Sequence, residues 1–244
     1  MIGGYGRGVL PATKNLLIIN LLFFLATYAF EYSSIADLTI ELGAFYPDSD
    51  YFKPWQIITH MFMHGGLAHI FFNMFALWMF GSSVEQAVGT KKFLFLYFFS
   101  GLGAYFLYNL FHFYEAQEII RQLPINDITL NDIKSLPVGN VYSQNKDLLT
   151  LSSIYTVPMV GASGALYGIL VAFGVLYPNA QLMLLFPPIP MKAKYFIPIL
   201  ILIELFQQYQ NNPQDNVAHL AHLGGALFGF IFIRKWKQNR FRVN

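Results

Sequence analysis

The sequence predicts an all-α integral membrane protein: a bundle of six transmembrane helices with both termini in the cytoplasm. Three observations lead to this prediction. The 244 residues are 55% hydrophobic and only 11% charged, whereas soluble domains carry about 25% charged residues. Six apolar segments reach or approach the length that crosses a bilayer, and basic residues gather in alternate loops. A single membrane domain over residues 1–244 is therefore expected.

The six expected spans differ in what they contain. They cover residues 14–31, 57–81, 93–113, 154–177, 194–209 and 217–234. The second is rich in histidine, the fourth holds a Gly-Ala-Ser-Gly sequence, and the fifth is short and contains a proline. The outer loops are expected at 31–56, at 114–153 and at 207–216, the last of them short and mobile. Short helices are expected at 115–122 and 130–136 within the second loop.

Charge placement predicts the orientation, because lysine and arginine accumulate in cytoplasmic loops. Eleven of the fifteen basic residues fall at the termini or in the loops after the second and fourth spans: Arg7, Lys14, Lys91, Lys92, Lys192, Lys194, Arg234, Lys235, Lys237, Arg240 and Arg242. The other side holds Lys53, Arg121, Lys134 and Lys146. Both termini are therefore expected on the cytoplasmic side.

Composition and charge narrow the class of protein. The chain has no cysteine, which excludes disulfides and thiolate chemistry. Its net charge of +2 is too small to predict nucleic-acid binding. No cleavable signal-peptide pattern stands at the N-terminus, which predicts a multi-pass protein of the cell (plasma or inner) membrane. The lipid bilayer is thus an expected partner, and no motif predicts the oligomeric state.

Ser163 lies between glycines in the fourth expected span. A serine inside a membrane usually bonds to its own helix or contacts a neighbouring one. Gly161 and Gly164 permit a tight backbone around it, and a helix that begins near Ser163 leaves its first N–H groups free to stabilise an oxyanion. The alternative is a packing face of small residues, which explains the glycines but does not require the serine.

His222 and Gly225 share one face of the sixth expected helix. That face can pack on the glycine face of the fourth span and bring the imidazole to Ser163, where a neutral histidine can take the serine proton. The sixth span holds no acid, so a dyad is expected rather than a triad. Tyr167, one turn after the serine, can orient the imidazole by stacking. His219 competes as the base but lacks the glycine spacing.

His69 and Asn73 are four residues apart and share a face of the second expected helix. Both can donate to a tetrahedral oxyanion, a contribution of about 10²–10³-fold for each donor. His60 and His64 have the same spacing and suggest metal binding, but the His-Glu-x-x-His pattern is absent. No metal or other cofactor is therefore expected. Glu204 is the only acid well inside a span, which excludes a pair of catalytic aspartates.

Taken in order, these residues resemble the rhomboid family of intramembrane serine proteases. The matching motifs are His60 and His64 ahead of His69-x-x-x-Asn73, then Glu85-x-x-x-Gly89, Gly161-x-Ser163-Gly164 and Ala221-His222-x-x-Gly225-x-x-x-Gly229. Each motif alone is weak, but the ordered set on the second, fourth and sixth spans is specific. The resemblance covers about residues 45–229.

The resemblance implies a rhomboid-like six-helix bundle that cleaves transmembrane protein substrates through an acyl-enzyme. Ser163 would be the nucleophile and His222 the general base and acid. His69, Asn73 and the backbone N–H of Ser163 would form the oxyanion hole. The supporting residues would be Gly161, Gly164, Tyr167 and Gly225. The fifth span and the loop after it would be a mobile gate.

Two features depart from the family pattern. Gln56 follows Trp55 where the family commonly has arginine, which puts the hydrogen bonds that anchor the first outer loop in question. Loop 114–153 is long, and no motif gives it a role. The alternative function is a proteolytically inactive rhomboid-like protein that binds membrane clients, although such relatives typically lack the serine or the histidine. A histidine-relay transporter ranks lower because no internal repeat is visible.

Overall fold

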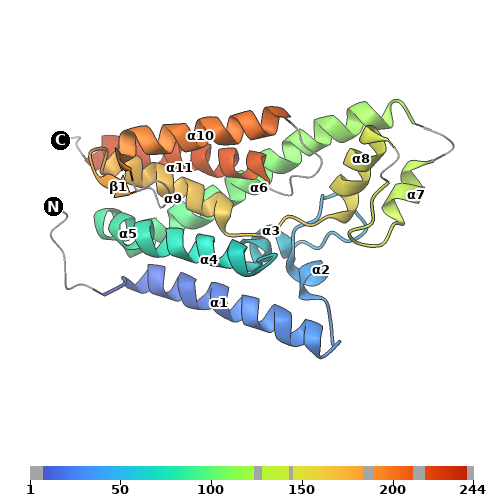
Figure 1. The fold of residues 1–244 in the computed structure, drawn as a ribbon, viewed down its shortest axis with the longest axis horizontal. Helices are drawn as coiled ribbons and strands as arrows, with labels where there is room; N and C mark the ends of the chain where they lie inside the picture. Colours follow the sequence, from blue (N-terminus) through green and yellow to red (C-terminus); the bar gives the residue numbers. More distant parts are fainter. Residues whose placement is uncertain (1–7, 124–127, 143–144, 184–188, 211–217, 241–244) are drawn as a thin grey trace.

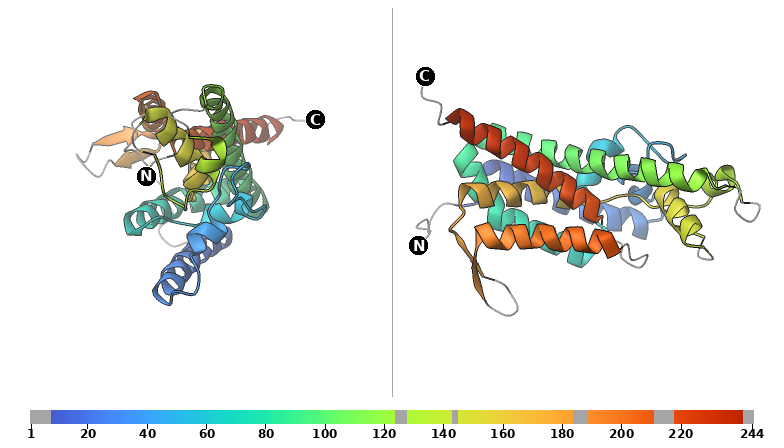
Figure 2. Two further views of the ribbon diagram at one scale, coloured as in Figure 1. Left: turned by 90° about the vertical axis from the view of Figure 1, so that its right-hand side faces the viewer. Right: turned by 90° about the horizontal axis from the view of Figure 1, so that it is seen from above.

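The protein is seen here in a computed structural model that describes residues 8–123, 128–142, 145–183, 189–210 and 218–240. The described chain is mostly helical, and its long helices lie side by side in a bundle (Figure 1). Its first and last described residues lie at the same end of the bundle (Figures 1 and 2). Two small helices, α7 (Leu130–Lys134) and α8 (Lys146–Thr156), lie at the opposite end.

The first expected span is confirmed as a helix. It is α1 (Pro11–Tyr32), which begins at a proline because the missing N–H costs nothing in the first turn. A short helix, α2 (Leu38–Leu42), follows it, capped by the side chain of Asp37. Within the described residues, three helices are long and apolar enough to cross a membrane: α1, the continuous run Leu67–Val88, and α6 (Thr90–Ile120).

The expected single helix over residues 57–81 is wrong. The chain forms a short helical segment, breaks, and resumes, in the order α3 (Gln56–Thr59), η1 (His60–Phe62), α4 (Leu67–Ala76), η2 (Leu77–Gly81) and α5 (Ser82–Val88). The break passes through Gly65 and Gly66, since glycine loses more conformational freedom in a helix than any other residue. His60 and His64 therefore do not share a helix face, as the metal-binding alternative required.

The helix at the third expected span is longer than predicted. α6 has 31 residues, and the short helix expected at 115–122 is largely its last two turns. α7 confirms the helix expected at 130–136. The sequence did not predict α8, which begins where the side chain of Asn145 caps its first turn. A small apolar cluster that includes Ile133, Leu148 and Tyr155 holds these elements together.

The expected single helix over residues 154–177 is also wrong. α8 ends at Thr156, and the chain then runs without helix until α9 (Ser163–Leu176). Pro158 explains the break, because proline disfavours helix both at its own position and at the residue before it. α9 has 14 residues and is about 21 Å long, which is less than the roughly 30 Å of a bilayer core.

The last two helices follow a small hairpin. Strands β1 (Gln181–Met183) and β2 (Pro190–Lys192) pair antiparallel and lead into α10 (Ala193–Gln210) and α11 (His219–Arg240). Both helices match the spans expected at 194–209 and 217–234, although α11 extends six residues further. The expected mobile loop at 207–216 lies largely outside the described residues, and its described part, 207–210, is the end of α10.

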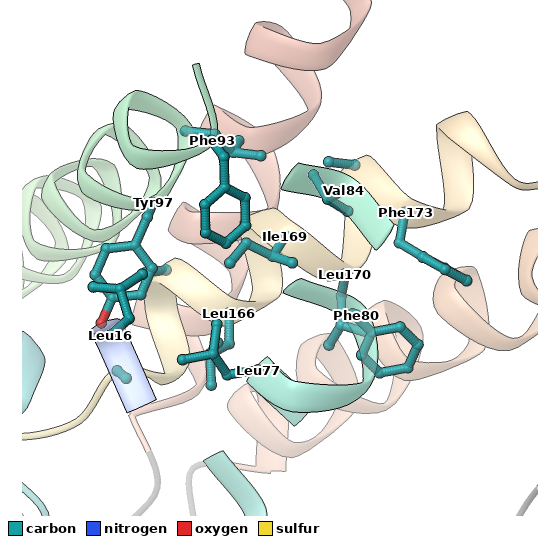
Figure 3. Packing of buried hydrophobic residues seen from close by; sticks show 14 of the residues in the cluster. Leu16, Leu77, Phe80, Val84, Phe93, Tyr97, Leu166, Ile169, Leu170 and Phe173 are labelled. Carbon is teal, nitrogen blue, oxygen red and sulfur yellow. The ribbon is translucent and has the colours of Figure 1, made fainter. Parts of the chain in front are cut away.

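α9 lies at the centre of the bundle, packed against α6 and α11, with α10 against α9 and α11 (Figure 2). Figure 3 shows side chains of α9 that point inward and meet those of η2, α5 and α6. The core residues labelled there are Leu77, Phe80, Val84, Phe93, Tyr97, Leu166, Ile169, Leu170 and Phe173, with Leu16 from α1. This packing fixes the position of the first residue of α9, which is Ser163.

Candidate active site

Ser163 and His222 meet where α9 and α11 begin. Nε2 of His222 lies 2.8 Å from Oγ of Ser163. His222 is buried, with 9% of the residue's surface exposed. A serine hydroxyl that contacts a histidine nitrogen at this distance is the usual geometry of a nucleophile and its base. The sequence brought these two residues together by helix-face reasoning, and the structure places them in contact.

The close approach of α9 and α11 explains the contact. A methyl group added to Gly225 would overlap the carbonyl oxygen of Gly164, and one added to Gly229 would overlap the backbone of Gly168. Small residues permit such backbone contact between helices in membranes. The expected packing of the two glycine faces is therefore confirmed.

Tyr167 lies flat against the imidazole of His222. The ring centres are 4.4 Å apart and the ring planes differ by 10°. The predicted stacking is thus confirmed. The hydroxyl of Tyr167 also donates a hydrogen bond to Oε1 of Glu204, so this side chain contacts both the histidine and an acid.

Glu204 is the site residue that the sequence did not place. It comes from α10, and its Oε1 lies 3.0 Å from Nδ1 of His222, within ion-pair distance but without the alignment of a hydrogen bond. Its Oε2 lies 2.5 Å from Nδ1 of His219. The sequence led us to expect no acid beside His222, because only acids on the same helix were considered. The one available signal was the rarity of an acid inside an apolar span.

The same three side chains are the group of potential metal ligands found in the described part of the chain. Glu204, His219 and His222 are all buried, and their ligand atoms lie within 4.8 Å of one another. His219 is held by the acid, whereas only His222 contacts the serine. The geometry therefore agrees with the choice of His222 over His219 as the candidate base.

His69 faces the serine across Gly161. A methyl group at Gly161 would lie 2.8 Å from Nε2 of His69 and 3.5 Å from Oγ of Ser163. Gly161 has a φ of 129°, a conformation that favours glycine. Its N–H donates to the carbonyl oxygen of His60 at 2.9 Å, which fixes the loop before α9.

Asn73 lies one turn after His69 on α4 and is 7% exposed. Its Nδ2 is buried and makes no hydrogen bond to any described residue. Unpaired buried donors are costly and uncommon in folded proteins. A cavity of about 10 Å³, lined in part by His60, Gly161 and Ser163, adjoins the serine, which is about the space that one water needs.

Gln56 anchors the loop before α3. Its side chain accepts from the backbone N–H groups of Phe45 and Lys53 and donates to the carbonyl oxygens of Ile40 and Tyr51. The doubt raised by the missing arginine is thus resolved, since the glutamine itself makes the anchoring hydrogen bonds.

The fold and the site together define a helical membrane protein with a partly buried serine–histidine pair. A family model described as the Rhomboid domain matches residues 51–237, more than half of the chain. The chain belongs to the rhomboid family.

Several curated proteins are similar to it. "Rhomboid protease AarA" of Providencia stuartii is 28% identical over 93% of this chain and 73% of its own length. "Rhomboid protein 1, mitochondrial" of Saccharomyces cerevisiae is 27% identical over 77% of this chain. "RHOMBOID-like protein 12, mitochondrial" of Arabidopsis thaliana is 30% identical over 76% of it. The chain spans 45% and 47% of those two mitochondrial proteins.

Proposed function

We propose that this chain is an intramembrane serine endopeptidase, which hydrolyses peptide bonds in or near transmembrane segments of membrane proteins. The observation that carries the proposal is the 2.8 Å contact between Nε2 of His222 and Oγ of Ser163. The family supports it, because "Rhomboid protease AarA" is named for protease activity.

In the proposed mechanism, Ser163 is the nucleophile and His222 the general base and acid. His222 takes the proton of Oγ as this oxygen attacks the substrate carbonyl, and then gives the proton to the leaving amine. A water in the cavity beside Ser163 attacks the acyl-enzyme in the second half of the reaction, with His222 again as the base. Peptide and water are thereby converted to two shorter chains.

The proposed oxyanion hole combines three groups. The backbone N–H of Ser163 belongs to the first turn of α9 and has no helical partner there. His69 faces the serine across Gly161, and Nδ2 of Asn73 is a buried donor without a described partner. Donors that are already in place are most effective where water is excluded. Gly161, Gly164, Tyr167 and Gly225 hold this geometry without taking part in bond changes.

We also propose that residues 1–244 form one membrane domain with six spans and cytoplasmic termini. The spans are α1, the run α4–α5, α6, α9, α10 and α11. Two observations support this topology: both ends of the described chain lie at one end of the bundle (Figure 1), and most basic residues of the described chain belong to elements that meet at that end. Ser163 then opens toward the outer side, where α7 and α8 lie.

The substrate must unwind locally before it can be cut. The backbone groups of a membrane helix are bonded to one another, so its carbonyls cannot reach Ser163 in helical form. Substrates with helix-weakening residues near the cut are therefore expected. The proposed location is the cell (plasma or inner) membrane, and membrane fractionation of cells that express the tagged chain tests it.

The function is tested in proteoliposomes with a generic transmembrane substrate and a fluorophosphonate probe. The wild type should cleave the substrate and be labelled, whereas Ser163→Ala and His222→Ala should do neither. Ser153→Ala and His112→Ala, which change the same residue types on α8 and α6, should behave as the wild type. Cleavage that survives Ser163→Ala would refute the mechanism. A wild type that neither cleaves nor labels would favour the inactive client-binding alternative.

A further inference from the structure

We infer that Glu204 is a positioning residue for His222, so that the proposed protease uses an acid–base–nucleophile arrangement rather than a dyad alone. This inference rests on the proposed function. It adds one residue from α10 to a site otherwise built by α4, α9 and α11.

The contacts of the carboxylate are specific to the site. Oε1 lies 3.0 Å from Nδ1 of His222 and also accepts the hydroxyl of Tyr167, the residue that stacks on the same imidazole. Oε2 lies 2.5 Å from Nδ1 of His219, one turn before His222 on α11. These partners of Glu204 are the proposed base itself and two of its neighbours.

Burial makes this arrangement unusual. Glu204 is 6% exposed, while Leu202, Ile203, Leu205 and Phe206 around it on α10 are exposed at the bundle surface. A carboxylate inside a membrane span is expensive and usually functional. α10 carries no other acid, and it presents this one toward the serine–histidine pair.

The chemistry of histidine gives the carboxylate a role. For Nε2 to accept the serine proton, the proton of the neutral ring must sit on Nδ1. A carboxylate 3.0 Å from Nδ1 favours that tautomer and stabilises the imidazolium that forms when the serine proton moves. Glu204 itself gains no proton in either step. Tyr167 keeps both the ring and the carboxylate in position.

A metal site at Glu204, His219 and His222 fits these distances less well. Two ligands of one tetrahedral zinc ion lie about 3.3 Å apart, because each is roughly 2.0–2.1 Å from the metal. Nδ1 of His219 lies only 2.5 Å from Oε2 of Glu204, so the two atoms bind each other directly. The other rival is a purely structural tie between α10 and α11.

The test compares Glu204→Gln with the wild type in the full chain, in proteoliposomes. We expect kcat for a transmembrane substrate and the fluorophosphonate labelling rate to fall by about 10²–10⁴-fold, as when the acid of a serine–histidine–acid triad is neutralised. KM should change less than threefold. Glu204→Asp, which keeps the charge, should recover part of the loss. Gln208→Ala, one turn further along α10, is the matched control and should label as the wild type.

The outcomes separate the inference from the proposed function. If the wild type neither cleaves nor labels, the proposed function fails. If it does both and folded Glu204→Gln labels within threefold of it, Glu204 is only a structural tie and the inference is overturned. A wild type that loses labelling on chelation and regains it with zinc also overturns it, in favour of a metal.

Tyr167→Phe decides the question if Glu204→Gln does not fold. Phenylalanine keeps the stacked ring but leaves Oε1 of Glu204 without its hydroxyl donor. We expect labelling to slow by about tenfold, the effect of one hydrogen bond to a charged group. Labelling at the wild-type rate would overturn the inference.

Discussion

Replacing Gln56 should loosen the loop that precedes α3. The side chain is fully buried and makes four hydrogen bonds to backbone groups of the first outer loop, at 3.0, 3.0, 3.2 and 3.4 Å. In Gln56→Met the side chain keeps nearly the same length but makes none of them. In Gln56→Ala a cavity forms as well. The two variants therefore separate lost hydrogen bonds from lost packing.

The magnitude follows from those contacts. A net hydrogen bond contributes about 0.5–1.5 kcal/mol, and the longest of the four contributes least, so Gln56→Met should lower the unfolding free energy by about 2–4 kcal/mol. At roughly 2–4 °C per kcal/mol for a chain of this size, the melting temperature should fall by about 4–16 °C. Gln56→Ala should fall further, because the cavity adds its own cost.

Thermal unfolding of the purified variants in detergent measures both values. Gln117→Ala, which changes an exposed glutamine on α6, should stay within about 0.5 kcal/mol of the wild type. If the melting temperature of Gln56→Met stays within about 2 °C of the wild type, the loss of stability is at most about 1 kcal/mol, and the reasoning is refuted. The four hydrogen bonds of Gln56 would then stabilise the folded chain no more than hydrogen bonds to water stabilise the unfolded chain.

Three further predictions follow from the packing and the charges. Gly225→Ala should cut fluorophosphonate labelling at least tenfold (about 1.4 kcal/mol), because its methyl group overlaps the carbonyl of Gly164 and separates α9 from α11. Gly161→Ala should do the same, since a methyl group there meets His69 at 2.8 Å and the φ of 129° adds about 1–3 kcal/mol of strain. In α7, capping hydrogen bonds hold the pKa of Asp132 below its ordinary value. The charge of Asp132 therefore stabilises α7 fully at pH values above the ordinary pKa of aspartate, and this stabilisation is lost as the pH falls through the lowered pKa. Amide hydrogen exchange in α7 should accordingly become faster below about pH 4.

The two glycine variants share one control. Gly8→Ala, where an added methyl group has nothing within 4 Å, should label as the wild type does. If Gly225→Ala labels equally fast, the site does not depend on the close contact of α9 and α11. Amide exchange in α7 that stays constant from pH 6 to pH 3, after correction for the intrinsic rate, would show that capping by Asp132 does not hold that helix.

Hydrophobicity located the helices but not their ends. The segments at 14–31 and 194–209 match α1 and α10 closely, because an apolar run without a break is read directly from the sequence. The two runs that failed, 57–81 and 154–177, contain helix-breaking residues that a hydrophobic window does not register. Gly66 and Pro158 were visible in the sequence, and propensity alone would have divided both runs.

The contact between Ser163 and His222 could be predicted because its cause is local in each helix. Glycines spaced along α9 and α11 mark two faces that can approach closely, and each face carries one of the two residues. Glu204 could not be placed in the same way. Which helix packs beside α11 is a property of the whole fold, and α10 carries no small-residue face that would announce the pairing.

The helix breaks also explain why the site lies where it does. Ser163 begins α9, His69 stands in the first turn of α4, and His222 in the first turn of α11. Three helix N-termini therefore converge at one level of the bundle, and each carries partial positive charge and unpaired N–H groups. Negative charge is most stable at such a level. The carboxylate of Glu204 lies at that level, 2.5 Å from Nδ1 of His219 and 3.0 Å from Nδ1 of His222, and the proposed oxyanion would form there as well. Continuous helices through 57–81 and 154–177 would place the N-termini of α4 and α9 inside regular hydrogen bonding, and the proposed oxyanion would then lose their free N–H groups.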